Sequence, residues 1–278
     1  WREAIGEFPF DKLSEVNQDR AKKIMKSRGM YRRLPKFRFA ADKDVYDFFA
    51  KHPEAAVAVW QVMAISKFQL KPTGDGTFTA DAKDGTVGKV EILHQTKNQI
   101  VTICDGTYNS PFLVKPIKAT GILHLQAEFE TDELGATHVT HVADLFVEFP
   151  SPAVEAAAKL ISPISNMMAD RNFQEVSLFV RLMTLAMSNQ PGWVELLVQR
   201  MDDEIPLALK DEMLTLTART FVENRKRVLA RKGENVSVDE IMQPLRKAAQ
   251  ESRDAANGKL SAPATIRITR QPSSKSPQ

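Results

Sequence analysis

The sequence predicts an α+β protein in which an antiparallel sheet is followed by a long helix. Between residues 67 and 149, apolar and polar residues alternate with a period of two, in short segments separated by turns that contain glycine or proline. Apolar residues recur at helical spacing on both sides of this region. Ser151 and Pro152 then supply an N-cap and a first-turn proline for the long helix. A series of strands between helical segments therefore defines the fold class.

Four elements are expected before the alternating region. Gly29 follows a segment with apolar residues among charges, which is typical of a surface helix that ends at glycine. Asp42 suits a helix N-cap, and because Pro53 is tolerated in the first turn of a helix but not in its interior, we expect two short helices here. The expected elements are a helix over 11–27, a strand over 36–40, and helices over about 43–51 and 53–63.

Six consecutive antiparallel strands are expected next, which gives a sheet of about seven strands. Their segments are 67–71, 78–80, 87–94, 99–105, 117–130 and 137–149. The expected cross-strand pairs are Val90 with Ile103, Ile92 with Val101, Leu123 with Ala143, Leu125 with His141, and Ala127 with Val139. In this register both hairpins present an apolar face to the long helix, whereas Lys89 and Glu91 face away.

The C-terminal part is expected to be helical. Apolar residues keep helical spacing up to Ser188, with a kink expected at Pro163. Further helices are expected over 193–201, 207–231 and 238–256, followed by a disordered segment rich in Ser, Pro, Lys and Arg. The expected organisation is an accessory N-terminal helix at 1–32, a main domain at 33–190, a helical extension at 191–257 and a disordered tail at 258–278.

This order of elements resembles the helix-grip superfamily, which includes START proteins, SRPBCC-like polyketide cyclases and the birch-pollen-allergen type. The resemblance extends over residues 33–190 and rests on the element order and on Ser151 and Pro152, which open the long helix. It implies a curved sheet of about seven strands around a long C-terminal helix, with a hydrophobic cavity between them. A cavity of this kind implies an apolar ligand such as a lipid, a sterol or a polyketide.

The candidate ligand-binding residues are those expected to face the long helix and the apolar side chains of that helix. Three polar residues, His94, Asp105 and His141, share the inward side, and a buried charge needs a partner, a ligand or water. For His141 a ligand hydrogen bond competes with a core histidine satisfied by its neighbours, and for Asp105 a cavity role competes with a turn-capping carboxylate. Methionines can line an adaptable cavity, although core packing is the more common reason for them. The candidate set is His141, Asp105, Val90, Ile92, Val101, Ile103, Leu125, Met167, Met168, Val180 and Met183.

No sequence pattern points to a catalytic or metal site. The chain contains no phosphate loop and no GxGxxG, GxSxG or HExxH motif. His124 and His138 are expected on one side of the last hairpin and His141 on the other, so the three cannot share one metal ion. Cys104 is expected to point outward with no histidine beside it. We therefore expect no catalytic residue, no metal and no cofactor.

A non-catalytic protein that binds or transfers a lipid-like ligand is the favoured function. The alternative is an interaction or scaffold protein whose core is filled by its own side chains. An enzyme of the cyclase or hydrolase type would need His141 and Asp105 within hydrogen-bond reach across the cavity. The positions of Leu125, His141 and Met183 distinguish the ligand-binding protein from the scaffold protein. Side chains that meet in a closed core favour the scaffold, and side chains that surround a cavity favour the ligand-binding protein.

Two basic arms flank an acidic body. Residues 1–43, 44–218 and 219–278 carry formal charges of +6, −10 and +7. Clustered cations are attracted to lipid headgroups or nucleic acid, but they also pair with an acidic body. Because folding back is intramolecular, we expect the helices over about 207–256 to pack against the main domain, and any contact with an anionic membrane to be weak and salt-sensitive. A nucleic-acid partner is not expected, and the oligomeric state is left open.

The compartment is left open as well. Cys104, the single cysteine, cannot form an intrachain disulfide, so cysteine content does not separate the cytoplasm from an oxidising compartment. The uncharged stretch 55–66 is shorter than the roughly 20 apolar residues of a membrane helix. Because the chain begins with Trp1 rather than methionine, we favour an exported or periplasmic location after removal of a signal peptide, with the cytoplasm as the alternative.

Overall fold

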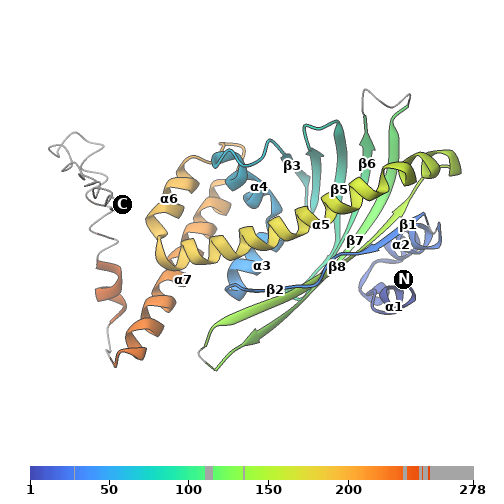
Figure 1. Cartoon of the computed structure of the whole chain (residues 1–278). Helices are drawn as coiled ribbons and strands as arrows, with labels where there is room; N and C mark the ends of the chain where they lie inside the picture. The colour runs from blue at the N-terminus through green and yellow to red at the C-terminus, as the bar shows by residue number, and fades with distance from the viewer. Residues whose placement is uncertain are drawn as a thin grey trace, which may run out of the picture. The chain divides into compact units, whose positions relative to one another are not determined.

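The structure is a computed structural model of the chain (Figure 1). It describes residues 1–27, 29–109, 115–133, 135–233, 237–243, 246 and 250, with only the helical backbone at 157, 159–166 and 168. The chain divides into two compact units, Trp1–Val228 and Leu229–Gln278. In the second unit, residues 238–243 are helical. The rest of the helix expected over 238–256 falls largely outside the described residues, and the expected tail at 258–278 falls wholly outside them.

The first unit follows the predicted element order, with additions near the N-terminus. Its elements are α1 (Arg2–Gly6), the 3-10 helix η1 (Phe10–Lys12), α2 (Glu15–Ser27), β1 (Met30–Arg33), β2 (Phe37–Ala40), α3 (Lys43–Lys51), α4 (Pro53–Val62), β3 (Gln69–Gly74), β4 (Thr77–Asp81), β5 (Thr86–Gln95), β6 (Gln99–Tyr108), β7 (Ile117–Thr131), β8 (Thr137–Glu148), α5 (Pro152–Asn189), α6 (Pro191–Gln199) and α7 (Leu207–Arg231). The helix expected over 11–27 is therefore two elements, η1 and α2, and α1 and β1 are new. Helix α7 continues for its last residues into the second unit.

Within the described residues the strands form one antiparallel sheet of eight, which confirms the predicted α+β class. Neighbouring strands follow the order β1-β8-β7-β6-β5-β4-β3, and β2 also pairs with β8. The long helix α5 crosses one side of the sheet, as in a helix-grip fold (Figure 1). Strand β1 was not predicted because its sequence, Met-Tyr-Arg-Arg, does not alternate between apolar and polar residues. In the structure its four residues are all half-buried.

Local capping explains where the helices begin. The Asp42 carboxylate accepts hydrogen bonds from the backbone amides of Asp44 and Val45, at 2.9 and 3.2 Å, and starts α3. Pro53 opens α4, as predicted, and the Ser151 hydroxyl caps α5. Helix α5 continues through Pro163, and the kink expected there stays a prediction. Among the described residues, no helix combines the length and apolarity needed to cross a membrane.

The pairing of β5 with β6 differs from the expected register by one residue. Ile103 lies opposite Glu91 rather than Val90, and a bulge between Ile92 and His94 shifts the pairing again toward the turn. Because neighbouring residues of a strand face opposite sides, the slip and the bulge place four predicted inward residues on the other face of the sheet. These residues are Val101, Ile103 and Asp105 of β6 and His94 of β5, which lies opposite Val101.

The pairing of β7 with β8 differs by two residues, which leaves each face unchanged. Leu125 lies opposite Ala143, and Ala127 lies opposite His141. The prediction that His141 lies on the opposite face from His124 and His138 is therefore confirmed, although its partner was wrong.

Each face of the sheet has its own core. The inner face, which includes Ala127 and Val139, packs with Phe179, Val180 and Met183 of α5. The outer face includes Val101, Ile103, Ile122 and Phe146, and it packs with apolar residues of the N-terminal helices and of the segments that join them, such as Ile24 of α2, Phe8 and Leu13. The sheet is thus covered on both sides, by α5 on one and by the N-terminal helices on the other (Figure 1).

The described part of α7 within the first unit packs against the sheet-and-helix domain, as predicted. Leu209, Met213 and Leu216 belong to the inner core. Arg219 of α7 makes an ion pair with Asp44 of α3 at 2.9 Å. The fold-back of the C-terminal arm is therefore confirmed as far as Val228.

Candidate functional site

A groove of about 1040 Å³ lies beside the C-terminal half of α5. Its walls come from the end of α4, the approach to β3, the turn between β4 and β5, one side of α5 and the start of α6. Four aromatic side chains, Trp60, Phe68, Phe179 and Trp193, line it. Ligand pockets in proteins begin at about 300 Å³. The groove is therefore large enough for a small organic molecule.

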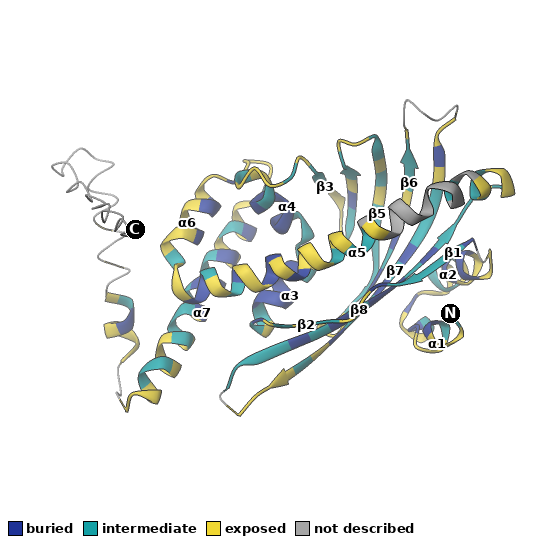
Figure 2. Cartoon of the chain, in the orientation of Figure 1, coloured by how far each residue is buried: buried dark blue, intermediate teal, exposed yellow. Residues whose placement is uncertain are grey.

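Large apolar side chains at the rim of the groove are exposed to solvent. Leu178, Leu182 and Leu185 of α5 are 50%, 53% and 50% exposed, and Ile65, in the turn after α4, is 63% exposed. Figure 2 shows the exposed positions along this part of α5. Exposed apolar residues that gather in one place mark a surface for a ligand or a partner.

The sequence of α5 explains why this rim exists. Phe179, Val180 and Met183 are buried in the inner core, as the predicted helical spacing requires. Leu178 and Leu182 extend the apolar surface beyond the side that is buried in the core, whereas Gln174 and Arg181 keep a further side of the helix polar. Apolar surface that the core does not cover favours contact with a ligand or a partner. This signal was present in the sequence and was not used to predict the groove.

Seven of the twenty described residues that line the groove have polar side chains, and several of these side chains are already bonded. The Arg171 guanidinium donates from Nε to the Glu175 carboxylate at 2.7 Å, one helical turn away. Asp84, in the β4–β5 turn, accepts a hydrogen bond from the backbone amide of Thr86 at 2.9 Å. The groove therefore offers a mainly apolar surface with charge at its margin.

His141, the first of the predicted site residues, lies outside this groove in a filled part of the inner core. It is 3% exposed, and it stacks on the Phe173 ring at 4.4 Å between ring centres. Its Nε2 is 2.7 Å from the Ser177 hydroxyl, which donates its own proton to the Phe173 carbonyl, so Nε2 must be the donor to Ser177. Its Nδ1 then accepts from the Tyr46 hydroxyl at 3.2 Å. Both ring nitrogens are therefore satisfied by protein groups.

Burial fixes the charge state of this histidine. Loss of hydration lowers the pKa of His141 to about 4 and raises the pKa of Tyr46. At neutral pH the hydrogen-bonded chain is uncharged and joins β8, α3 and α5. Of the two alternatives for His141, the structure matches the core histidine satisfied by its neighbours.

The other predicted ligand-binding residues fall into three groups. Val90, Ile92 and Leu125 are half-buried on the inner face, Val180 is buried in the core, and Met183 is buried and also lines the groove. Met167 is exposed, and the side chain of Met168 lies outside the described part of the chain. Val101, Ile103 and Asp105 lie on the outer face, where the one-residue slip of β6 places them.

His141 and Asp105 do not lie within hydrogen-bond reach of each other, as an enzyme of the cyclase or hydrolase type would need. Asp105 is exposed on the outer face, where it accepts a hydrogen bond from the Thr120 hydroxyl at 2.6 Å, whereas His141 is on the inner face. The same slip places Cys104 on the inner face rather than the outer one. Burial raises the pKa of the Cys104 thiol to about 11, so the thiol stays protonated at neutral pH. Among the described residues, no group of three or more His, Cys, Asp or Glu side chains could hold a metal ion.

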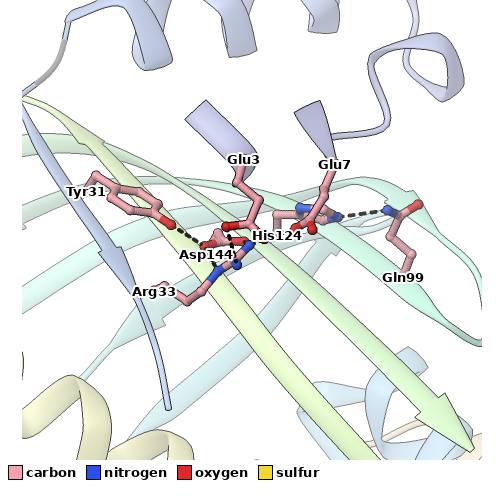
Figure 3. A network of polar contacts seen from close by, with 7 residues as sticks. All are labelled: Glu3, Glu7, Tyr31, Arg33, Gln99, His124 and Asp144. Carbon is pink, nitrogen blue, oxygen red and sulfur yellow. Dashed lines mark hydrogen bonds and ion pairs between the residues drawn. The ribbon is translucent and has the colours of Figure 1, made fainter. Parts of the chain in front are cut away.

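A second polar assembly, the outer-face cluster, lies beneath α1 and consists of Glu3, Glu7, Tyr31, Arg33, Gln99, His124 and Asp144 (Figure 3). The Asp144 side chain is fully buried and accepts two hydrogen bonds from the Arg33 guanidinium, at 2.9 and 3.0 Å, and one from the Tyr31 hydroxyl at 2.8 Å. Arg33 also binds Glu7 of the segment after α1, at 2.7 Å. Burial and the bond to Asp144 raise the pKa of Tyr31 to about 12. These contacts fasten the N-terminal helices to β1 and β8.

His124 completes the outer-face cluster on the neighbouring strand. The Gln99 side-chain amide donates to its Nε2 at 2.8 Å, and the Phe8 ring lies edge-on at 5.3 Å. Its Nδ1 is buried and has no hydrogen-bond partner among the described residues. Burial lowers the pKa of His124, which favours the neutral ring. The cluster is covered by α1 and is built as a structural anchor rather than as an open site.

Comparison with known proteins gives similarity at the level of structure. No family model and no curated protein matches the sequence. A conserved protein from Geobacillus kaustophilus is similar in structure with a TM-score of 0.39 and 10% identity, over 54% of this chain and 95% of that one. Norcoclaurine synthase from Thalictrum flavum has a TM-score of 0.34 and 11% identity, over 56% and 87%. The di-domain ARO/CYC protein BexL has a TM-score of 0.31 and 16% identity, over 60% and 54%. At these values no ligand or activity is transferred to this chain.

Proposed function

We propose that this protein binds an apolar small molecule in the groove beside α5 and holds it without chemical change. The observation that carries the proposal is a groove of about 1040 Å³ with aromatic walls and three half-exposed leucines at its rim. Each of those leucines leaves apolar surface in water at an unfavourable free energy of about 25 cal/mol per Å². A ligand that covers this surface recovers that free energy.

The interior around His141 supports placing the ligand in the groove rather than in that part of the core. The space beside His141 is occupied by Phe37, Phe39 and Phe173, and the imidazole has no bonding capacity left for a ligand. Met183 is the predicted site residue that the groove and the core share. We therefore propose the same class of ligand, an apolar one, as the sequence analysis did. We place it in the groove beside α5 rather than between the sheet and α5.

An interaction protein is the second candidate, and two observations favour it. His141 and Met183 are packed in a core that the chain's own side chains fill, which is the arrangement expected for this alternative. Leu178, Leu182 and Leu185 have the i, i+4, i+7 spacing with which a helix binds a partner helix. A bound partner would cover the rim without filling the groove. The two candidates therefore predict different responses to a small apolar molecule.

Tryptophan fluorescence tests the proposal, because two of the three tryptophans, Trp60 and Trp193, line the groove. Titration of the full chain with 1-decanol should change the emission and saturate at micromolar to submillimolar concentration. Leu182→Glu, which places a charge at the rim, should weaken this binding at least tenfold. The control is Val16→Glu on α2, which also places a charge at an exposed apolar position, 71% exposed against 53% for Leu182, but far from the groove in sequence, and it should bind as the unmodified chain does. Absence of a saturable change would reject the ligand-binding proposal in favour of the interaction protein.

A further inference from the structure

The charged side chains that line the groove include more anions than cations. Among the described residues, Arg171 is the cation of the lining, and Asp84 and Glu175 are its anions. The guanidinium of Arg171 is already bonded to Glu175. Asp84 accepts a hydrogen bond from a backbone amide, and it makes no ion pair with a cation of the described part of the chain. The groove therefore carries one carboxylate whose charge is not balanced within its walls.

The cations next to these positions do not supply the missing balance. Lys83 precedes Asp84 in the turn, but its ammonium is bonded to Asp81 at 2.6 Å. Lys67 stands between two lining residues and does not itself line the groove. An anionic headgroup would thus meet an unpaired carboxylate and a guanidinium that is already engaged.

The aromatic walls add to this preference. The Trp60 and Phe179 rings are in edge-to-face contact at 5.4 Å, and Phe68 and Trp193 line the same groove. Aromatic faces attract cations, and tryptophan does so most strongly. An apolar groove with aromatic walls and an unpaired carboxylate matches a molecule with an apolar body and a positive end.

We propose that the ligand class of the groove is a cationic amphiphile, an apolar or aromatic body that carries a protonated amine or a quaternary ammonium group. This inference rests on the proposed function and specifies the charge of its ligand. The apolar body occupies the aromatic part of the groove, and the cation is attracted toward Asp84. Because Asp84 is exposed, the attraction is modest and is screened by salt.

Three probes with the same chain length test the inference. The full chain is titrated with decyltrimethylammonium, 1-decanol and decanoate below their aggregation concentrations, with tryptophan emission as the readout. At low ionic strength decyltrimethylammonium should bind about tenfold more tightly than decanoate, with 1-decanol between them. At high salt the difference should shrink to less than about threefold.

Asp84→Asn assigns the effect to one residue. The asparagine can still accept the Thr86 amide, so the turn is preserved, while its charge is lost. Affinity for decyltrimethylammonium should fall about threefold, and affinity for 1-decanol should not change. Asp75→Asn, in the neighbouring exposed turn outside the lining, is the matched control and should change neither affinity.

The outcomes separate this inference from the function on which it rests. Equal affinity for all three probes, tighter binding of decanoate, or an Asp84→Asn variant that binds the cation as the unmodified chain does would each overturn the cationic class and leave apolar binding standing. Failure of all three probes to bind would overturn the proposed function itself.

Discussion

The groove beside α5 and the outer-face cluster beneath α1 use side chains in opposite ways. In the outer-face cluster, the fully buried Asp144 carboxylate is bonded to Arg33 and Tyr31, while Glu3 and Glu7 at its edge stay partly exposed. In the groove, apolar groups such as Leu182 are left in water, although a core lies on the other side of the same helix. The first region stabilises the fold, and the second has the exposed apolar surface for which we propose ligand binding.

The energetic reason lies in what each arrangement costs without a partner. A buried carboxylate without bonds is strongly destabilising, so the outer-face cluster is stable only if its ion pairs form on folding. A half-exposed leucine costs much less, and that cost can be recovered later by binding. Structure therefore depends on the first region, and function is proposed for the second.

The largest effect is expected when the buried carboxylate of the outer-face cluster is removed. Asp144→Ala leaves Arg33 and Tyr31 without their shared buried acceptor, so the free energy of unfolding should fall by about 3–5 kcal/mol. Chemical denaturation at pH 7 measures this change. Glu130→Ala, which removes one partner of the exposed pair with Arg38, should cost less than about 1 kcal/mol. Equal losses in the two variants would show that the cluster contributes no more than a surface pair.

Two neighbouring residues of α5 compare its buried side with the groove rim. Met183→Ala removes a 2% exposed side chain from the inner core and should lower the free energy of unfolding by about 2–4 kcal/mol. Leu182→Ala removes a 53% exposed side chain and should change it by less than about 1 kcal/mol. A large loss for Leu182→Ala would mean that the rim is part of the fold rather than a free surface.

The pH dependence should reveal the buried, neutral state of His141. Its pKa is lowered by burial to about 4, below the ordinary value of 6.5, so the unfolded chain takes up its proton first as the pH falls. The contribution of His141 to the free energy of unfolding is therefore present above pH 6.5 and is lost as the pH falls. This free energy should decrease by about 2 kcal/mol between pH 7.5 and pH 5. NMR titration provides the internal control, because hydrogen bonding to Glu54 raises the pKa of His52. A His141 signal that titrates together with His52 would contradict this assignment.

The sign for His52 is opposite. Because its pKa is raised in the folded chain, it stabilises the fold below the ordinary value of 6.5, and that contribution is lost as the pH rises through the folded value. The two histidines therefore report on two different kinds of environment in one titration.

The smallest effect is expected at the ion pair that lines the groove. Arg171→Ala removes an exposed bond to Glu175 one helical turn away, so the free energy of unfolding should change by less than about 0.5 kcal/mol. Binding of decyltrimethylammonium should strengthen instead, because Glu175 is released as a second unpaired carboxylate. Thermal denaturation and fluorescence titration of the same variant measure both changes. A weakened affinity for the cation would argue that Arg171 contacts the ligand.

Helix boundaries were predictable from the sequence because they depend on local chemistry. Pro53 separates α3 from α4 where expected, and α7 spans Leu207–Arg231 as its apolar spacing indicates. Strand pairing was less predictable, since a bulge near Ile92 changes the register of β5 and β6 without an obvious sequence signal. That single shift misplaced Val101, Ile103 and Asp105 in the expected cavity.

The apolar character of the candidate site was predicted from the sequence, but its position in the fold was not. The apolar, methionine-containing helix was recognised, and Met183 does line the groove. Trp60 and Trp193 were not assigned to a site, because they come from separate helices that only the folded chain brings to one groove. Leu178 and Leu182 carried a readable signal, an apolar side of α5 that the core does not use.

The central claim is that the apolar ligand site is the groove beside α5. A decanol-length alcohol with a photoreactive diazirine, activated in the presence of the full chain and mapped by mass spectrometry, tests it directly. The account predicts adducts on the groove residues Trp60, Met63 and Trp193, with competition by unlabelled 1-decanol. Competed adducts on Phe8 or Ile24 beneath the N-terminal helices, or on inner-face strand residues such as Leu125, with none on the groove, would contradict it.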